Sequence, residues 1–337
     1  MRLRNTWRTL AIKITVAIGI FAAANLLTYE TSGYFLREHE YYAVVAGFTE
    51  HQHVRSVFVG DSHVAQLDNE ILADDAYNVA FGGDGLREIY AKLRYLLSRP
   101  NEIDTLFLTA DAHMFGTGRL QSSNGAFADM YLLRTGSPFG LEHGRLATVF
   151  NLVPLFNDDF VQYLKLDIAK GWKRSPRGGD DEDTDAGWSS RPQEERERIA
   201  RETGIGDHRG IGAHSEPFQW YVRIVDLARA HGVHVIAVRY PSTAAYLESE
   251  TPADDMVIDR ALAAVGLADI LDYRHVFADA SYFKDPDHLS KKGIAALMQL
   301  LENQTRRKLR AAGSDDQPAG TASAAASRSS DRRGLRD

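Results

Sequence analysis

The chain has 337 residues, of which 44% are hydrophobic and 25% are charged, and its formal net charge is -7. This length allows one large domain or two small ones around a substantial core. The acidic balance argues against a nucleic-acid partner, which normally requires a basic face, and the lack of cysteine excludes disulfides, thiol nucleophiles and cysteine-ligated metals.

The first 32 residues are predicted to be a signal anchor. Three basic residues precede an apolar run: Arg2, Arg4 and Arg8. The run covers residues 10–27 and is interrupted only by Lys13, which can snorkel to the interface. About 18–20 apolar residues cross a bilayer as a helix, and basic residues on the leading side keep that side in the cytoplasm. We therefore expect a single-pass inner-membrane protein whose remaining residues are periplasmic. A signal peptide cleaved near residues 22–24 and a buried helix are the alternatives.

A helical or irregular neck is expected over residues 33–53, after which strands and helices alternate. Continuous apolar runs next to glycine or aspartate predict strands over residues 54–60, 76–83, 104–111, 233–241 and 269–273. Apolar stripes at helical spacing predict helices over residues 86–99, 217–232, 253–265 and 290–308. Such alternation predicts one α/β domain over residues 54–308, with a parallel sheet covered on both faces.

The middle of this domain lacks a regular pattern and is predicted to be an irregular insertion over about residues 112–216. Within it, residues 173–198 are polar, dense in charge and contain glycine and proline, so we expect disorder there. Residues 309–337 have too little apolar content to fold and are predicted to be a disordered tail.

A short polar turn follows the first predicted strand. Its sequence is Gly60-Asp61-Ser62-His63. In an open parallel sheet, ligands bind beyond the carboxyl ends of the strands, and a helix starting near Val64 would direct amide groups at the turn. Ser62 is thus a candidate nucleophile. A serine hydroxyl needs a base within hydrogen-bond reach and usually a carboxylate that orients the base.

The stretch before the last predicted helix supplies both groups. His288 is a candidate base, and Asp285 lies three residues before it, where the two side chains can meet. The sequence therefore predicts a triad of Ser62, His288 and Asp285. Asp287 is the alternative carboxylate, although adjacent side chains tend to diverge.

A metal site is not expected. Histidines and an aspartate occur close together in this region: His51, His53, Asp61 and His63. Their spacing matches no zinc signature, and no cofactor is predicted. Five aromatic residues of the insertion and its flank are either sugar-stacking groups or core: Tyr131, Trp172, Trp188, Trp220 and Tyr221.

Two motifs carry a family resemblance. The Gly-Asp-Ser-His block at residues 60–63 and the Asp-Pro-x-His-Leu block at residues 285–289 resemble the SGNH (GDSL-like) hydrolase superfamily, over about residues 54–305. The resemblance is closest to membrane-anchored bacterial proteins that O-acetylate exopolysaccharides or cell-envelope polymers. It implies a three-layer α/β/α, flavodoxin-like fold. It also implies that Ser62 is the nucleophile and that the backbone amides of Ser62 and Gly83 are oxyanion donors.

The chain departs from the family at the third block. A Gly-x-Asn sequence is expected after the third strand, and Thr109-Ala110-Asp111 stands there instead. An ionised Asp111 facing an oxyanion would be repulsive, where a donor would contribute roughly 2.7–4 kcal/mol. Asp111 is therefore a predicted oxyanion or substrate-site residue that is turned aside, is protonated or has another role, or else the activity is weak or absent. His113 follows two residues later, so its side chain could point to the same face as that of Asp111.

The function implied is that of a serine esterase or O-acetyltransferase that acts on a polysaccharide through an acyl-serine intermediate. The expected partners are the polymer and an acyl donor or a membrane-bound acyltransferase. A non-catalytic binding or assembly factor on the same fold is the alternative, and a lipase or phospholipase is the third hypothesis.

Overall fold

The computed structural model describes most of the chain. The described residues are 2–51, 53–70, 72–120, 124–136, 141, 145–151, 153–157, 160–161, 164–165, 184–212, 215–267 and 270–315. The chain divides by its internal contacts into two units, Met1–Ala295 and Ala296–Asp337.

A five-stranded sheet with the strand order β2-β1-β3-β4-β5 forms the centre of the first unit. Its strands are β1 (Ser56–Val59), β2 (Ala76–Asn78), β3 (Thr105–Thr109), β4 (His234–Arg239) and β5 (Ile270–Asp272). Every pair is parallel. The predicted α/β class and parallel sheet are therefore confirmed, and each strand lies within its predicted range. The strand order reverses between β1 and β3, which is the switch point where ligands of open parallel sheets bind.

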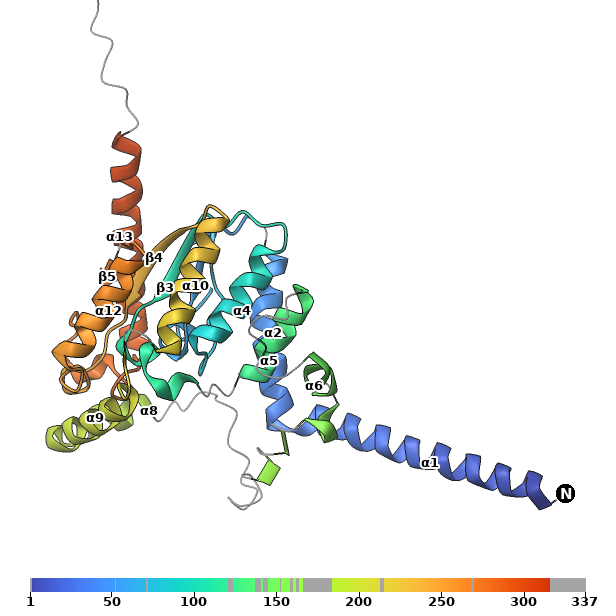
Figure 1. The fold of residues 1–337 in the computed structure, drawn as a ribbon. Helices are drawn as coiled ribbons and strands as arrows, with labels where there is room; N and C mark the ends of the chain where they lie inside the picture. The colour runs from blue at the N-terminus through green and yellow to red at the C-terminus, as the bar shows by residue number, and fades with distance from the viewer. Residues whose placement is uncertain are drawn as a thin grey trace, which may run out of the picture. The chain divides into compact units, whose positions relative to one another are not determined.

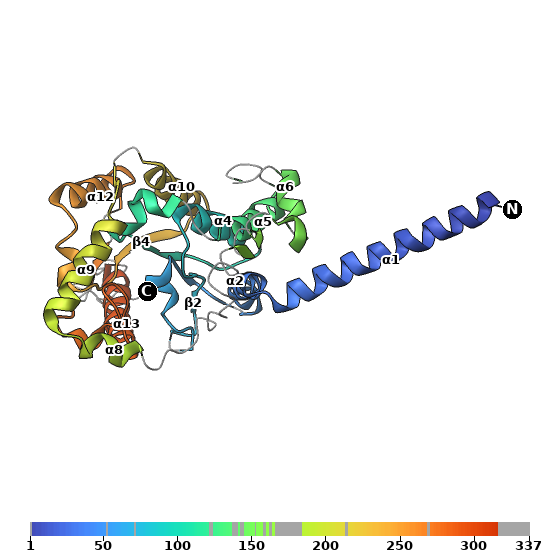
Figure 2. The same cartoon turned by 90° about the horizontal axis from the view of Figure 1, so that it is seen from below.

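Both faces of the sheet are buried, as the continuous apolar runs predict. Val57 and Leu106 lie side by side in the main core cluster, whereas Phe58 and Phe107 point to the opposite face and stack with ring centroids 4.3 Å apart. Two helices, α4 (Leu86–Leu97) and α10 (Glu216–Ala230), pack side by side on the first of these faces (Figures 1 and 2).

The N-terminal segment forms two consecutive helices, α1 (Arg2–Thr31) and α2 (Gly33–Glu50). Within the described residues, α1 is long and apolar enough over Trp7–Thr31 to cross a membrane, with a mean hydropathy of 2.0. The predicted neck is helical, which is one of its two expected forms, and it packs against the core. α2 buries a row of large side chains in the main core: Tyr34, Phe35, Tyr41, Val45 and Phe48. The compact unit therefore includes α2 and does not begin at residue 54.

The predicted insertion consists of short helices as far as it is described. They are η1 (Ala112–Phe115), η2 (Thr117–Leu120), α5 (Gly125–Arg134), α6 (Arg145–Phe150), η3 (Pro154–Phe156), α8 (Thr184–Ser190) and α9 (Gln193–Asp207). The prediction of disorder is wrong over residues 184–198, because most of these residues form α8 and α9. Their charges support a helix through pairs four residues apart, such as Arg191 with Glu195 and Arg198 with Glu202. Residues 173–183 lie outside the described part.

The remaining helices follow β1, β4 and β5 in the chain. They are α3 (Ser62–Ala65), α11 (Ala244–Leu247), α12 (Pro252–Ala264), η4 (Ala280–Tyr282) and α13 (Lys291–Asp315). α12 begins with Thr251 and Asp254 in a capping box, which satisfies the free amides of its first turn. α13 continues to Asp315, past the predicted end at residue 308, and residues 316–337 of the predicted tail are outside the described part.

Gly60 allows the chain to turn sharply from β1 into α3. A Cβ at this position would lie 2.1 Å from Val64 Cγ2 and 3.3 Å from Thr109 Cβ. Gly60→Ala should therefore lower the free energy of unfolding by about 1–3 kcal/mol through overpacking. Gly206→Ala is the matched control, because a Cβ there meets nothing within 4 Å. Urea unfolding of the full chain in detergent measures both, and equal effects would contradict this reading of the turn.

Candidate functional site

Ser62 stands at the carboxyl end of β1, as the first residue of α3. Asp61 caps this short helix, since its side chain accepts a hydrogen bond from the backbone amide of His63 at 3.2 Å. The loop that follows β2 runs beside Ser62: a Cβ on Gly82 would lie 3.9 Å from the Ser62 Cβ. Gly83 follows with a left-handed φ of 84°. The structure thus brings Ser62 and the Gly82–Gly83 turn together.

A buried polar network holds this loop. Asn124 Nδ2 donates to the Gly82 carbonyl at 3.1 Å and to Asp84 Oδ1 at 2.8 Å, and Arg37 from α2 donates to the same carbonyl at 2.8 Å. Lys92 forms an ion pair with Asp84. Burial raises the pKa of Asp84 to about 6, although the charge of Lys92 counteracts it. These hydrogen bonds and this ion pair therefore fix the backbone next to Ser62.

His63 is a buried link between two distant segments. Its ring is 1% exposed; Nδ1 donates to Asp111 Oδ2 at 2.9 Å and Nε2 donates to Asp287 Oδ2 at 3.1 Å. Burial alone would lower the pKa of His63, but the charge of Asp61 and the hydrogen bonds to Asp111 and Asp287 raise it well above its usual value. Because both ring nitrogens donate to carboxylates, His63 is an imidazolium.

Asp111 is turned toward this imidazolium. Its second oxygen, Oδ1, accepts the backbone amide of Tyr240 at 2.7 Å, and Thr109 Oγ1 donates to Oδ2 at 3.3 Å. Both carboxylate oxygens therefore have protein partners. The negative charge of Asp111 is therefore balanced by the neighbouring imidazolium of His63.

Asp61 is the centre of a second group of buried charges next to His63. Its Oδ2 accepts hydrogen bonds from His113 Nε2 at 2.8 Å and forms an ion pair with Arg119 at 3.0 Å. Burial would raise the pKa of Asp61, but His113, His63 and Arg119 hold it well below its usual range. The rings of His63 and His113 lie 4.4 Å apart, so the two halves form one cluster.

His288 lies at the edge of this cluster, where its side chain is 22% exposed. Nδ1 donates to Asp285 Oδ1 at 3.0 Å and lies 3.4 Å from Asp287 Oδ1. The spacing argument for Asp285 therefore matches the geometry, and Asp287 also contributes. The ring is 5.2 Å from that of His63, in an edge-on contact. Among the described residues, the carboxylates thus contact one ring nitrogen of His288, Nδ1.

The charge state of His288 follows from these carboxylates. Burial lowers its pKa, but the hydrogen bonds to Asp285 and Asp287 outweigh burial and raise the pKa to about 9. The same bonds, with that of His63, hold the pKa of Asp287 well below its usual range despite burial. Among the described residues, no hydrogen bond joins the Ser62 hydroxyl to His288. Catalytic hydrogen bonds of this kind are often long before a substrate binds.

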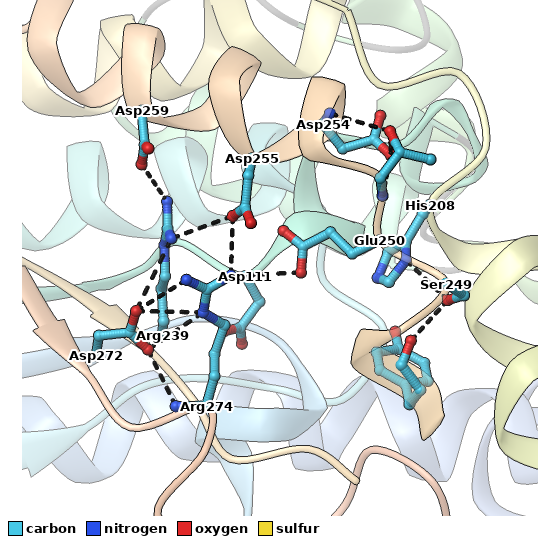
Figure 3. Close-up of polar contacts among 12 residues, drawn as sticks. Asp111, His208, Arg239, Ser249, Glu250, Asp254, Asp255, Asp259, Asp272 and Arg274 are labelled. Carbon is cyan, nitrogen blue, oxygen red and sulfur yellow. Dashed lines mark hydrogen bonds and ion pairs between the residues drawn. The ribbon is translucent and has the colours of Figure 1, made fainter. Parts of the chain in front are cut away.

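A second ionic cluster fixes the neighbouring strand ends (Figure 3). Arg239 is the last residue of β4 and Arg274 lies two residues after β5. Their guanidinium groups lie among four carboxylates: Glu250, Asp255, Asp259 and Asp272. Burial and the charge of Asp255 raise the pKa of Glu250 to about 7, although Arg274 lowers it. Because Tyr240 follows Arg239, this cluster also positions the amide that binds Asp111.

Two groups of side chains have the residue types of a metal site. They are Asp61, His63 and His113, and His63, Asp287 and His288, with ligand atoms within 4.8 Å of one another. A metal ion would need a lone pair on His63, whose two ring nitrogens both donate to carboxylates. His63 belongs to both groups, and it has a lone pair for a metal ion only if it gives up one of these hydrogen bonds.

The sequence predicted Ser62, Asp285 and His288 as site residues, but it did not predict the charged network around His63. The pairing of His63 with Asp111 and Asp287 was not predicted, nor were the roles of Asp61 and Arg119. The one available signal was the histidine that directly follows Ser62 in the first motif. Of the aromatic residues considered for sugar stacking, four are buried and belong to the core: Tyr131, Trp188, Trp220 and Tyr221. Trp172 lies outside the described residues.

The site therefore combines a hydroxyl, an imidazole and carboxylates at the carboxyl end of a parallel sheet, which is the set that acyl transfer requires. The chain matches none of the protein-family models and none of the curated proteins with which it was compared. The side-chain geometry and the two motifs are what remain to indicate a function.

Replacement of His63 tests whether the buried cation stabilises the fold. His63→Gln leaves Asp111 without its positive partner and leaves Asp287 with His288 alone, which should lower the free energy of unfolding by about 3–5 kcal/mol. His231→Gln is the control, since His231 is exposed at the end of α10 and should change stability by about 0.5 kcal/mol or less. Urea unfolding of the full chain in detergent would contradict the role if both variants unfolded like the wild type.

Proposed function

We propose that the protein is a membrane-anchored serine esterase or O-acetyltransferase of the SGNH type, with the three-layer fold of that family, that acts on a carbohydrate polymer. One observation supports it above the others. The turn after β1 contacts the loop at residues 285–289, through His63 with Asp287 and through Gln66 Oε1, which accepts the Leu289 amide at 3.1 Å. This contact brings the two motifs to one end of the sheet.

In the proposed reaction, the Ser62 hydroxyl attacks the carbonyl carbon of an acyl ester. Nε2 of His288 takes the hydroxyl proton and returns it to the departing alkoxide, which leaves an acyl-serine. A sugar hydroxyl or water then attacks the acyl group and gives its proton to His288, which passes it to the departing Ser62 oxygen and so restores the hydroxyl. Asp285 holds Nδ1 throughout, so the ring presents Nε2. The backbone amides of Ser62 and Gly83 are the proposed oxyanion donors.

The neighbouring carboxylates keep His288 mostly protonated at neutral pH, and a protonated imidazole cannot act as a base. With a pKa of about 9, only on the order of a few per cent of the imidazole is neutral near pH 7.5. A bound acyl group that displaces water from the ring would favour the neutral form, because desolvation penalises the charged one. The proposed reaction should therefore be faster in alkaline solution.

The proposed location follows from α1. Basic residues precede its apolar span and predict a cytoplasmic N-terminus, which leaves the α/β unit on the periplasmic side of the inner membrane. A catalytic unit held there could receive acyl groups from a membrane-bound acyltransferase.

A second candidate is a non-catalytic binding or assembly factor on the same fold. Two observations favour it: the absence of a Ser62–His288 hydrogen bond among the described residues, and the protonated state of His288 at neutral pH. Both candidates use the same surface, and they differ in whether Ser62 reacts.

A serine-directed fluorophosphonate distinguishes the two candidates. We expect the full chain to be labelled at Ser62 and the label to be lost in Ser62→Ala and in His288→Ala, because the hydroxyl needs the imidazole. Ser189→Ala, which alters an exposed serine of α8, should be labelled like the wild type. Peptide mapping by mass spectrometry identifies the labelled residue. An unreactive wild type would favour the binding factor.

The pH dependence of ester hydrolysis tests the role of the carboxylates. The value of kcat/KM for p-nitrophenyl acetate should rise with pH as His288 loses its proton, with an apparent pKa near 9. Asp285→Asn removes a partner of the imidazolium, so the apparent pKa should move down toward about 6.5 while the maximum rate falls.

Two controls accompany this profile. Ser62→Ala supplies the background of spontaneous hydrolysis at each pH. Asp226→Asn, an exposed position on α10, should keep the wild-type profile. A profile that Asp285→Asn does not shift would exclude the proposed link between the carboxylate and the base.

A further inference from the structure

Five large apolar side chains lie exposed within twelve residues of the insertion. They belong to α6 and η3 and form what we name the α6–η3 patch: Leu146, Val149, Phe150, Leu155 and Phe156. Their exposed fractions run from 41% to 70%. Single exposed apolar residues are ordinary, but a contiguous group marks a surface that contacts another apolar phase.

The patch is continuous with α1. The ring of Phe156 packs against Phe21 with centroids 5.6 Å apart, and Phe150 contacts Phe156 at 6.2 Å. The backbone amide of Leu155 donates to Asn25 Oδ1 at 3.0 Å. Phe21 and Asn25 both lie within the apolar span of α1.

The position of these contacts along α1 gives their depth. From Trp7 to Asn25 the helix rises roughly 27 Å at 1.5 Å per residue, close to the hydrocarbon thickness of about 30 Å. With Trp7 at the cytoplasmic interface, Asn25 lies at the opposite boundary, and Phe21 lies about 6 Å deeper. The patch therefore reaches the level of the outer acyl chains.

The partners of Asn25 fit this depth. A polar side chain near hydrocarbon needs partners within the protein. Asn25 Nδ2 donates to the Phe21 carbonyl at 2.8 Å, and Oδ1 accepts the Leu155 amide. η3 thus satisfies the side chain while its own apolar residues point outward.

We propose that the α6–η3 patch is a second membrane contact, which inserts into the outer leaflet beside α1. The occupant of this surface is the lipid of the membrane that α1 spans. The inference rests on the anchoring part of the proposed function and is independent of the chemistry of Ser62. Two attachment points would restrict rotation of the α/β unit about α1.

The lack of native cysteine allows a direct test, because a single introduced cysteine carries the only thiol. Phe156→Cys and Val149→Cys, made in the full chain, are labelled with the fluorophore NBD and reconstituted in phosphatidylcholine–phosphatidylglycerol vesicles. We expect blue-shifted emission and quenching by doxyl-labelled lipids at both positions. Ile205→Cys is the matched control, an apolar residue of α9 that is 66% exposed, and should respond to aqueous iodide instead.

A probe inside α1 separates the possible failures. Ile18→Cys should be quenched by the lipids; if it is not, α1 does not span the bilayer, and both this inference and the anchoring proposal fail. Quenching at Ile18→Cys with an iodide-accessible Phe156→Cys would overturn the inference alone. Protection of Phe156→Cys from iodide without lipid quenching would also overturn it, because a protein would then cover the patch. None of these outcomes bears on fluorophosphonate labelling of Ser62.

Discussion

The candidate site depends on the ion pairs that the buried His63 forms with Asp111 and Asp287. In a medium of low dielectric, a cation without partners is strongly unfavourable, and two buried carboxylates without a cation are equally so. His63 binds Asp111 at the end of β3 and Asp287 in the loop before α13. Three segments that are distant in sequence therefore meet where the charge of His63 balances the two carboxylates. The contact between the two motifs follows from this charge balance, whichever reaction the site performs.

The same charge balance affects the chemistry. Asp287 is shared between His63 and His288, so the group that holds the loop in place also stabilises the protonated form of the candidate base. A base works best when its pKa lies near the operating pH, and here stability and basicity oppose each other. The opposition would be relieved when a substrate excludes water from His288, which is partly exposed, while His63 stays buried. The two imidazoles therefore differ in their surroundings: His63 is buried between carboxylates, whereas His288 is partly exposed and would be the one that a substrate can reach.

The sequence predicted the sheet well because its signals are local. Each strand is a short apolar run that ends at glycine or a charged residue, and these features survive any tertiary context. The helices at residues 184–207 were missed because charge density also occurs in disordered chains, and the spacing of Arg191 and Glu195 was not weighed. The pair of Asp285 and His288 could be found because both lie in one loop. The bond between Asp111 and His63 could not, since it depends on how η1 turns the chain after β3.

A continuous path of packed residues connects the N-terminal helix with the candidate nucleophile. Only Ser32 separates α1 from α2, and Tyr29 packs on Phe35 and His39 across this junction. Arg37, which lies between Phe35 and His39 on α2, donates to the carbonyl of Gly82, which lies beside Ser62. A flexible linker would let the α/β unit sample many distances from a membrane. A helix that enters the core and holds the site loop does not, so an anchor in α1 would also set where the site stands.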